Sequence, residues 1–181
     1  LVPADIQGLK PGQVRYTMIT NEDGGVLDDL MIARPAEPGA AGDLYIVVNA
    51  GCKHQDWALI EEATKGEANL VRADDRCLLA LQGPTAHAVA AAVIDPALAE
   101  MNFMTVKRYD AFGRITVTRS GYTGEDGFEL ILPAAEVVVG NHKTLTDFLL
   151  PDWDSDRPAS PRELAVAAAE HGTRYVLVTG V

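Results

Sequence analysis

A strand–turn–strand pattern near the start of the chain places the strongest constraint on its fold. Residues 13–20 (QVRYTMIT) alternate in polarity, which predicts a half-buried strand. Residues 21–25 (NEDGG) follow, and the two glycines can adopt the positive φ angles of a tight turn. Residues 26–33 (VLDDLMIA) then form the returning strand. The chain therefore begins with a predicted β-hairpin, and its fold must cover the apolar side chains of that hairpin.

The rest of the chain continues this mixed pattern. A third strand is expected at 43–50, a buried strand at 76–82, a hairpin-like pair at 106–111 and 114–119, and a further strand at 128–133. Helices are expected at 53–65, with Trp57, Ile60 and Thr64 on one side, and at 85–94. Because helices and strands do not alternate regularly, the predicted fold class is α+β with a mostly antiparallel sheet.

The C-terminal segment has a different character. Ser160, Pro161 and Glu163 form a capping box with proline at the first helical position. The predicted helix ends at Gly172, and an almost continuous apolar strand follows at 174–181. This order is typical of a parallel α/β layer, and the proline-rich and aspartate-rich residues 149–161 predict a linker before it.

Charge and composition exclude several functional classes. The formal net charge of -11 argues against nucleic-acid binding, and no apolar run has the length of a membrane span. The first residues lack the pattern of a signal peptide. Cys52 and Cys77 form no CxxC pair, which favours a reducing, cytoplasmic location. His54 lies two residues from Cys52, but no further ligands are spaced for a metal, so no metal site is expected.

Asp28 and Asp29 stand side by side in an otherwise apolar strand. Because neighbouring strand residues face opposite sides, only one of the two carboxylates can face the core side. A carboxylate held against apolar surface suits a general base or a group that anchors a ligand. The alternative is a pair of acids at the strand edge that bind backbone N–H groups. The spacing does not choose between Asp28 and Asp29.

A glycine-rich and acidic segment, SGYTGEDGFE (120–129), lies between two predicted strands. Tyr122 and Glu129 bracket it, and a carboxylate beside an aromatic ring suits a flat heterocycle with an amidine-like edge. Tyr16 offers a second aromatic wall. The glycines would let the backbone approach a ligand closely. The alternative is a glycine-rich turn whose acids are solvated.

Four motifs occur in a characteristic order: YTMITNEDGGVLDDLM, LYIVVNAGC, LLALQGPTA and RSGYTGEDGFEL. Together they resemble the folate-binding core of the aminomethyltransferase family, the T-proteins of the glycine cleavage system. The resemblance covers residues 1–136. It implies a tetrahydrofolate-dependent enzyme that takes an aminomethyl group from the lipoyl arm of H-protein, releases ammonia and forms 5,10-methylenetetrahydrofolate. H-protein and folate are the partners that it implies.

The resemblance also assigns roles to individual residues. It selects Asp29 as the essential aspartate close to the reacting folate nitrogens. Tyr16 and Tyr122 match folate-contacting tyrosines, and Asn49 matches the asparagine of the VVNA strand. Glu129 matches the glutamate that binds the amino edge of the pterin.

The match to the family pattern stops near residue 136. The chain starts after the family's first strands, and residues 140–181 weakly resemble a segment of a ribokinase-like pyridoxine kinase. We therefore expect a truncated or composite chain, with a partial folate-binding domain at 1–136 and an αβ appendage at 137–181. Three alternatives remain: the folate domain of a dimethylglycine or sarcosine dehydrogenase, a non-catalytic folate-binding module, and an inactive fusion fragment.

Overall fold

The computed structural model describes residues 1–37, 39–40, 42–111, 113–133, 137–141 and 175–179. These residues form two compact units. The first contains Leu1–Ala73, Leu79–Tyr109 and Thr116–Leu130, and the second contains Asp74–Leu78, Asp110–Ile115 and the described residues from Ile131 onward. The predicted division at residue 136 stays a prediction. No helix in the described part of the chain combines the length and the apolar character needed to cross a membrane.

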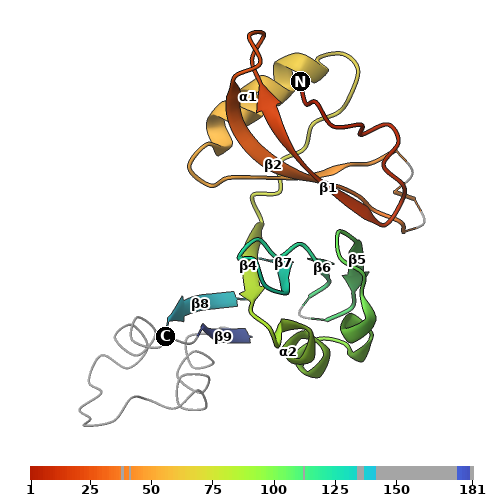
Figure 1. Ribbon diagram of the computed structural model, residues 1–181, viewed down its shortest axis with the longest axis vertical. Coiled ribbons are helices and arrows are strands. Elements are labelled where there is room, and N and C mark those ends of the chain that lie inside the picture. Colours follow the sequence, from red (N-terminus) through yellow and green to blue (C-terminus); the bar gives the residue numbers. More distant parts are fainter. Residues whose placement is uncertain (38, 41, 112, 134–136, 142–174, 180–181) are drawn as a thin grey trace. The chain divides into compact units, whose positions relative to one another are not determined.

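The predicted N-terminal hairpin is confirmed. Strands β1 (Gln13–Thr20) and β2 (Val26–Arg34) pair antiparallel, and β3 (Tyr45–Val48) pairs antiparallel with the other edge of β2. In the turn, Gly24 adopts a φ of +80°, and the Asn21 N–H donates to the Gly25 carbonyl at 2.9 Å. Figure 1 shows this twisted three-stranded sheet, in the order β1-β2-β3, with helix α1 beside it.

Helix α1 (Lys53–Thr64) covers one face of the three-stranded sheet. Its Ile60 packs in a core cluster with Ile19, Leu30 and Ile32. The buried residues of α1 are Asp56 and Ile60, and Trp57 and Thr64, at helical spacings of three and four from Ile60, are half-buried. The guanidinium of Arg72 lies over the Trp57 ring, 5.5 Å from its centre.

The opposite face of the sheet has its own small core. Val14 of β1, Ala33 of β2 and Val106 pack together, with Met31 and Met104 beside them. Leu30 and Ile32 therefore point to one side of β2, and Met31 and Ala33 point to the other, as strand geometry requires. Asp28 follows the phase of Leu30, and Asp29 follows the phase of Met31.

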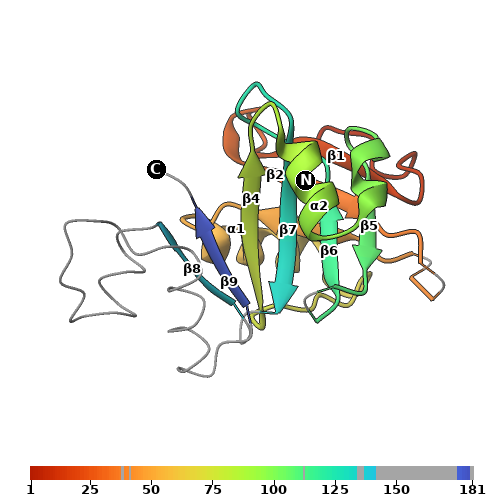
Figure 2. The ribbon, with the colours of Figure 1, turned by 90° about the horizontal axis from the view of Figure 1, so that it is seen from below.

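Strands β4 (Arg76–Gln82), β5 (Val106–Tyr109), β6 (Ile115–Thr118) and β7 (Gly127–Pro133) form a second sheet, in the order β4-β7-β6-β5 (Figure 2). Strand β7 has neighbours on both edges, and all of its residues except Pro133 are buried. The expectation that 76–82 is a buried strand is wrong. Strand β4 is terminal in this order and none of its residues is fully buried, because one of its edges pairs with no described strand.

Helix α2 (Ala86–Val93) and the short 3-10 helix η1 (Pro96–Glu100) pack against one another. The sequence predicted α2 but not η1. The side chain of Asp95 caps η1 by accepting a hydrogen bond from the Ala97 N–H at 2.8 Å, and Pro96 occupies the first position of the helix.

The C-terminal strand is also confirmed. Strand β9 (Tyr175–Thr179) pairs in parallel with β8 (Val137–Asn141), a strand that the sequence did not predict. The predicted linker at 149–161 and the predicted helix that ends at Gly172 lie outside the described residues. The α+β class with mostly antiparallel strands agrees with this architecture.

Candidate functional site

Asp29 lies on β2 where β1 can supply a partner side chain. The register pairs Asp29 with Met18 and Met31 with Tyr16, so Tyr16 and Asp29 are diagonal neighbours on the same face. The Tyr16 hydroxyl donates to Asp29 Oδ2 at 2.6 Å. This hydrogen bond, together with some burial and the negative charge of the carboxylates, raises the pKa of Tyr16 above its usual value. Tyr16 is 55% exposed, so the phenol and the carboxylate can meet a ligand from solvent.

Asn49 approaches Asp29 from the other edge of β2. Val48 pairs with Leu30, so Asn49, the next residue, comes to lie beside Asp29. Its amide nitrogen is 2.6 Å from Asp29 Oδ1, 3.1 Å from the Asp29 carbonyl oxygen and 3.0 Å from Asp28 Oδ1. One NH₂ group has two hydrogens, and these three acceptors share them. The structure thus unites three of the five predicted site residues, namely Tyr16, Asp29 and Asn49.

Asp28 belongs to the same hydrogen-bonded group, although the family resemblance selected Asp29 and the strand spacing chose neither. It faces the side of β2 that α1 covers, where Cys52 and Asp56 lie close to it. Burial acts to raise the pKa of Asp28, but hydrogen bonds from Asn49, Asp56, the Asp29 backbone N–H and Cys52 outweigh it and lower the pKa overall. The alternation of strand residues could have indicated this position, but it could not have indicated the partners from α1.

Glu129 has a different environment, inside the second sheet. It is 7% exposed on β7, and the Ser120 hydroxyl donates to its Oε2 at 2.8 Å. The Thr118 hydroxyl lies 3.5 Å from the same oxygen and 2.6 Å from the Ser120 hydroxyl. Oε1 receives no hydrogen bond from the described residues. Because a carboxylate oxygen can accept two hydrogen bonds, Glu129 keeps the capacity to bind a further donor.

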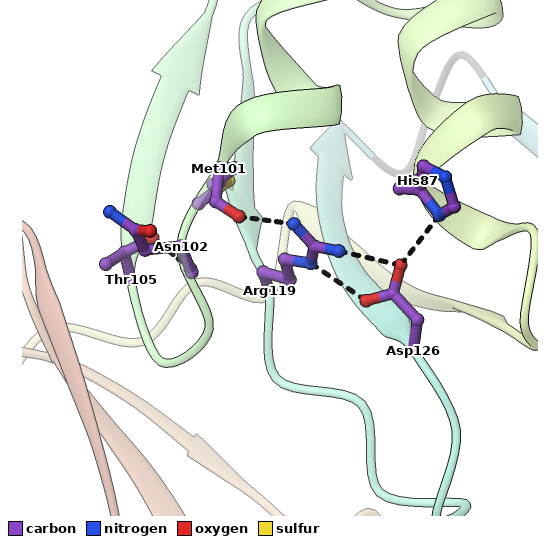
Figure 3. Close-up of polar contacts among 6 residues, drawn as sticks. All are labelled: His87, Met101, Asn102, Thr105, Arg119 and Asp126. Atoms are coloured by element: carbon purple, nitrogen blue, oxygen red, sulfur yellow. Dashed lines mark hydrogen bonds and ion pairs between the residues drawn. The ribbon is translucent and has the colours of Figure 1, made fainter.

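Arg119 and Asp126 join the two ends of the segment that precedes β7 (Figure 3). The guanidinium donates two hydrogen bonds to Asp126, at 2.8 and 2.9 Å, and a third to the Met101 carbonyl oxygen. Nδ1 of His87 lies 3.2 Å from Asp126 Oδ2. The hydrogen bonds from Arg119 are the main reason that the pKa of Asp126 lies below its usual value. One of the acids in this segment is therefore structural.

Gly121 of this segment allows two stretches of backbone to approach one another closely. The Gly121 N–H donates to the Gly127 carbonyl at 3.0 Å, and a Cβ atom on Gly121 would lie 2.7 Å from the Gly127 nitrogen. Any side chain at position 121 would therefore displace the backbone. Between these glycines Tyr122 is 69% exposed, and Glu125 is exposed as well. The structure thus places Tyr122 in the segment that leads to β7 and keeps its ring open to solvent.

The family model of the GCVT N-terminal domain matches residues 1–145. The chain belongs to the GCVT N-terminal domain family.

Relatives of this GCVT domain carry consistent names. The human mitochondrial aminomethyltransferase is 43% identical over 145 residues, which are 76% of this chain and 35% of that protein. The mitochondrial aminomethyltransferase of Flaveria pringlei is 41% identical over the same shares. The crystal structure of the glycine cleavage system aminomethyltransferase T from Bartonella henselae is 44% identical with a TM-score of 0.61, over 73% of this chain and 35% of that one. This chain spans about a third of the length of these relatives. The resemblance of the C-terminal segment to a pyridoxine kinase stays a prediction.

Two chemical capacities follow from the residues of this GCVT domain. The partly exposed Asp29 can exchange a proton with a ligand, because Tyr16 and Asn49 hold its carboxylate in one orientation. The buried Glu129 can accept a further N–H hydrogen bond, because its Oε1 receives none from the described residues. The described residues contain no group of three or more His, Cys, Asp or Glu side chains able to hold a metal ion.

Proposed function

We propose that this GCVT domain is the folate-binding part of an enzyme that transfers an aminomethyl group from lipoylated H-protein to tetrahydrofolate, with release of ammonia. The observation that carries this proposal is the Asp29 carboxylate, held by Tyr16 at 2.6 Å and by Asn49 at 2.6 Å on an accessible strand. The names of the human and Bartonella henselae relatives support the reaction class and the glycine cleavage system as its setting.

The donor and acceptor groups of the chain suit tetrahydrofolate. A pterin presents an amino group and a ring N–H on one edge, and the free acceptor capacity of Glu129 matches such a pair of donors. The exposed rings of Tyr16 and Tyr122 offer flat apolar surface for the heterocycle. We assign Tyr16, Asn49, Tyr122 and Glu129 to folate binding. When bound, tetrahydrofolate supplies the nitrogen nucleophile that accepts the one-carbon unit.

The residues around Asp29 account for its proposed catalytic role. Tyr16 and Asn49 each donate a hydrogen bond to a different carboxylate oxygen, so the group cannot rotate freely. A carboxylate fixed in this way stabilises positive charge that develops near it, and it can hold a proton while an amine departs. Lipoylated H-protein would deliver the aminomethyl group to this accessible face. We also propose a cytoplasmic location, which the two free thiols Cys52 and Cys77 support.

Calorimetric titration of the chain with tetrahydrofolate tests the proposal. Saturable binding to one site is the expected result, and the Glu129→Gln variant should weaken it. A chain that remains folded by circular dichroism but releases no heat with tetrahydrofolate would contradict the proposed function. No specific observation favours a dehydrogenase folate domain or a non-catalytic module over the aminomethyltransferase.

A further inference from the structure

Asp56 is a fully buried acid in the first turn of α1. Ile60, four residues later, packs against Leu30 and Ile32 of β2. Residues four apart lie on the same side of a helix, so Asp56 also faces β2. Asp28 lies on that face of β2, in phase with Leu30. The fold therefore brings the carboxyl groups of Asp56 and Asp28 together, next to the hydrogen-bonded group of Asn49 and Asp29.

Three oxygens in this pair have no hydrogen-bond donor when both groups are written as carboxylates. They are Oδ1 and Oδ2 of Asp56 and Oδ2 of Asp28, and all three are buried. Ion pairs among the described residues involve neither Asp28 nor Asp56. Two adjacent carboxylates with three buried oxygens that lack a donor are unfavourable, so a further proton is needed to stabilise the pair.

We infer that Asp28 and Asp56 share one proton, which Asp56 carries and donates to Asp28 Oδ2, and that Asp56 is thereby a positioning residue for the Asp28–Asn49–Asp29 network. One proton supplies the missing donor. It turns an oxygen of Asp56 into a donor, gives Asp28 Oδ2 a partner, and reduces the charge of the pair from -2 to -1. Asp28 Oδ1 then stays available to Asn49, whose amide nitrogen also binds Asp29 Oδ1 at 2.6 Å.

The electrostatics of the surrounding groups agree with a shared proton. Burial, followed by the hydrogen bond to Asp28 and the negative charge of Asp28, raises the pKa of Asp56 to about 6. The N-terminus of α1 would favour a negative charge on Asp56, but burial has the larger effect. Cys52 is a further titratable group that faces the pair, and the neighbouring Asp29 lies on the opposite face of β2. Burial and the charges of the three aspartates raise the pKa of the Cys52 thiol, so Cys52 remains neutral beside them.

A shared proton makes the stability of the fold depend on pH in a defined range. In the unfolded chain an aspartate releases its proton near pH 4, whereas folded Asp56 keeps it up to about pH 6. The folded state therefore binds more protons between these values, and its stability decreases as the pH rises through that interval. Above it, the hydrogen bond from Asp56 to Asp28 is lost.

Carboxyl ¹³C NMR titration of the full chain, without folate, tests the inference directly. We expect the Asp56 resonance to titrate about two pH units above an ordinary aspartate, and we expect Asp28→Asn to lower that midpoint. An Asp56 resonance that titrates near pH 4, or a midpoint that Asp28→Asn leaves unchanged, would overturn the shared proton.

A matched pair of variants separates positioning from packing. The amide of Asp56→Asn can donate to Asp28 at every pH, so this variant should keep the Asn49 side-chain amide resonances of the wild type and lose the decrease in stability between pH 4 and 6. Asp56→Ala cannot donate and should shift those resonances. Asn49 resonances that move equally in both variants would assign Asp56 to packing alone.

The link from Asp56 to catalysis rests on the proposed function, and a separate measurement tests it. In turnover assays Asp56→Asn should flatten the pH profile of kcat near pH 6 and leave KM for tetrahydrofolate unchanged. An unaltered pH profile of kcat would show that Asp56 does not influence turnover. Failure of tetrahydrofolate to bind at all would contradict the proposed function, while the NMR titration would still decide the shared proton.

Discussion

The two proposed ligand-contacting carboxylates occupy contrasting environments. Asp29 is half-buried on a strand of the three-stranded sheet and is held by a phenol and an amide, one on each of its oxygens. Glu129 is 7% exposed on the central strand of the four-stranded sheet, and two hydroxyl groups approach the same oxygen. The first arrangement fixes a carboxylate but leaves it accessible. The second buries a carboxylate and leaves one oxygen free.

This difference indicates a division of labour. An accessible carboxylate with fixed orientation suits proton handling, because reacting groups can reach it. A buried carboxylate with one free oxygen suits recognition, because an unfilled acceptor rejects a ligand that lacks the matching donors. Changes at Asp29 should therefore affect rate, and changes at Glu129 should affect affinity.

The largest expected effect is that of Asp29→Asn on turnover. The amide keeps the shape but cannot hold a proton as a carboxylate does, so kcat should fall about 10²–10⁴-fold. Turnover would be measured with aminomethylated H-protein and tetrahydrofolate, with this sequence placed in the corresponding third of a full-length relative. Asp23→Asn, at an exposed position of the hairpin turn, is the matched control. Full activity of Asp29→Asn would contradict the proposed catalytic role of Asp29.

The next largest effect is expected at Arg119, which supports the Glu129 region. Arg119→Gln leaves Asp126 without its two charged hydrogen bonds, and both side chains are only about one-fifth exposed. Breaking a buried ion pair by removing one partner costs 3–5 kcal/mol, so this partly buried case should lower the free energy of unfolding by about 3 kcal/mol. Urea unfolding of both proteins measures this difference in the free energy of unfolding.

Two controls accompany the Arg119 variant. Lys65→Gln breaks an ion pair with Glu62 whose side chains are 75% and 79% exposed, and it should change stability by less than about 1 kcal/mol. Because the pKa of Asp126 is lowered in the folded state, the ion pair contributes to the free energy of unfolding above about pH 4. This contribution is lost as the pH falls through the pKa of folded Asp126. Wild type and Arg119→Gln should therefore converge in acid. A constant difference down to pH 2 would contradict the assigned cause.

A smaller effect is expected for Glu129→Gln on affinity. The amide replaces one acceptor oxygen and removes the charge, so tetrahydrofolate binding should weaken by about 2 kcal/mol, or roughly 30-fold. Isothermal calorimetry measures this difference. Glu125→Gln changes an exposed acid in the same segment and should bind like the wild type. Equal weakening in both variants would indicate a general charge effect rather than recognition by Glu129.

The smallest effect concerns the turn that leads into the Asp29 strand. Gly24 has a φ of +80°, which an alanine adopts at a cost of about 1–2 kcal/mol. Gly24→Ala should lower the free energy of unfolding by about 1 kcal/mol relative to Gly51→Ala, because Gly51 has no positive φ and open space around it. Thermal unfolding would measure the difference. Equal melting temperatures of the two variants would show that the positive φ of Gly24 does not affect stability.

Local patterns predicted most of the described elements. The hairpin at 13–33 and helix α1 were predictable because alternation and turn residues act over a few positions. The burial of 76–82 was not, because an apolar run is equally compatible with a central and a terminal strand, and only the sheet order decides between them. The short helix η1 was missed although Asp95 and Pro96 form a helix-start signal in the sequence, because the helix has only five residues and they show no helical periodicity.

The same limit applies to the candidate site. Asp28 and Asp29 could be placed on opposite faces of β2, but no spacing indicates that Asn49, the residue after β3, reaches both carboxylates. Asp56 was overlooked because an acid in the first turn of a helix normally faces water. Its burial results from the packing of α1 on the sheet, which is a tertiary property. The role of Asp126 was also hidden, because no sequence pattern indicates that Arg119, seven residues earlier, folds back onto it.

Parallel calorimetric titrations of the wild type, Asp29→Asn and Glu129→Gln with tetrahydrofolate test the division of labour most directly. The account predicts that Asp29→Asn binds within about threefold of the wild type, because an interaction made mainly in the transition state contributes little to ground-state binding. Glu129→Gln should bind roughly 30-fold more weakly, because it loses a charged acceptor. The opposite order, with Asp29→Asn the weaker binder and Glu129→Gln unchanged, would contradict the assignment of rate to one region and recognition to the other.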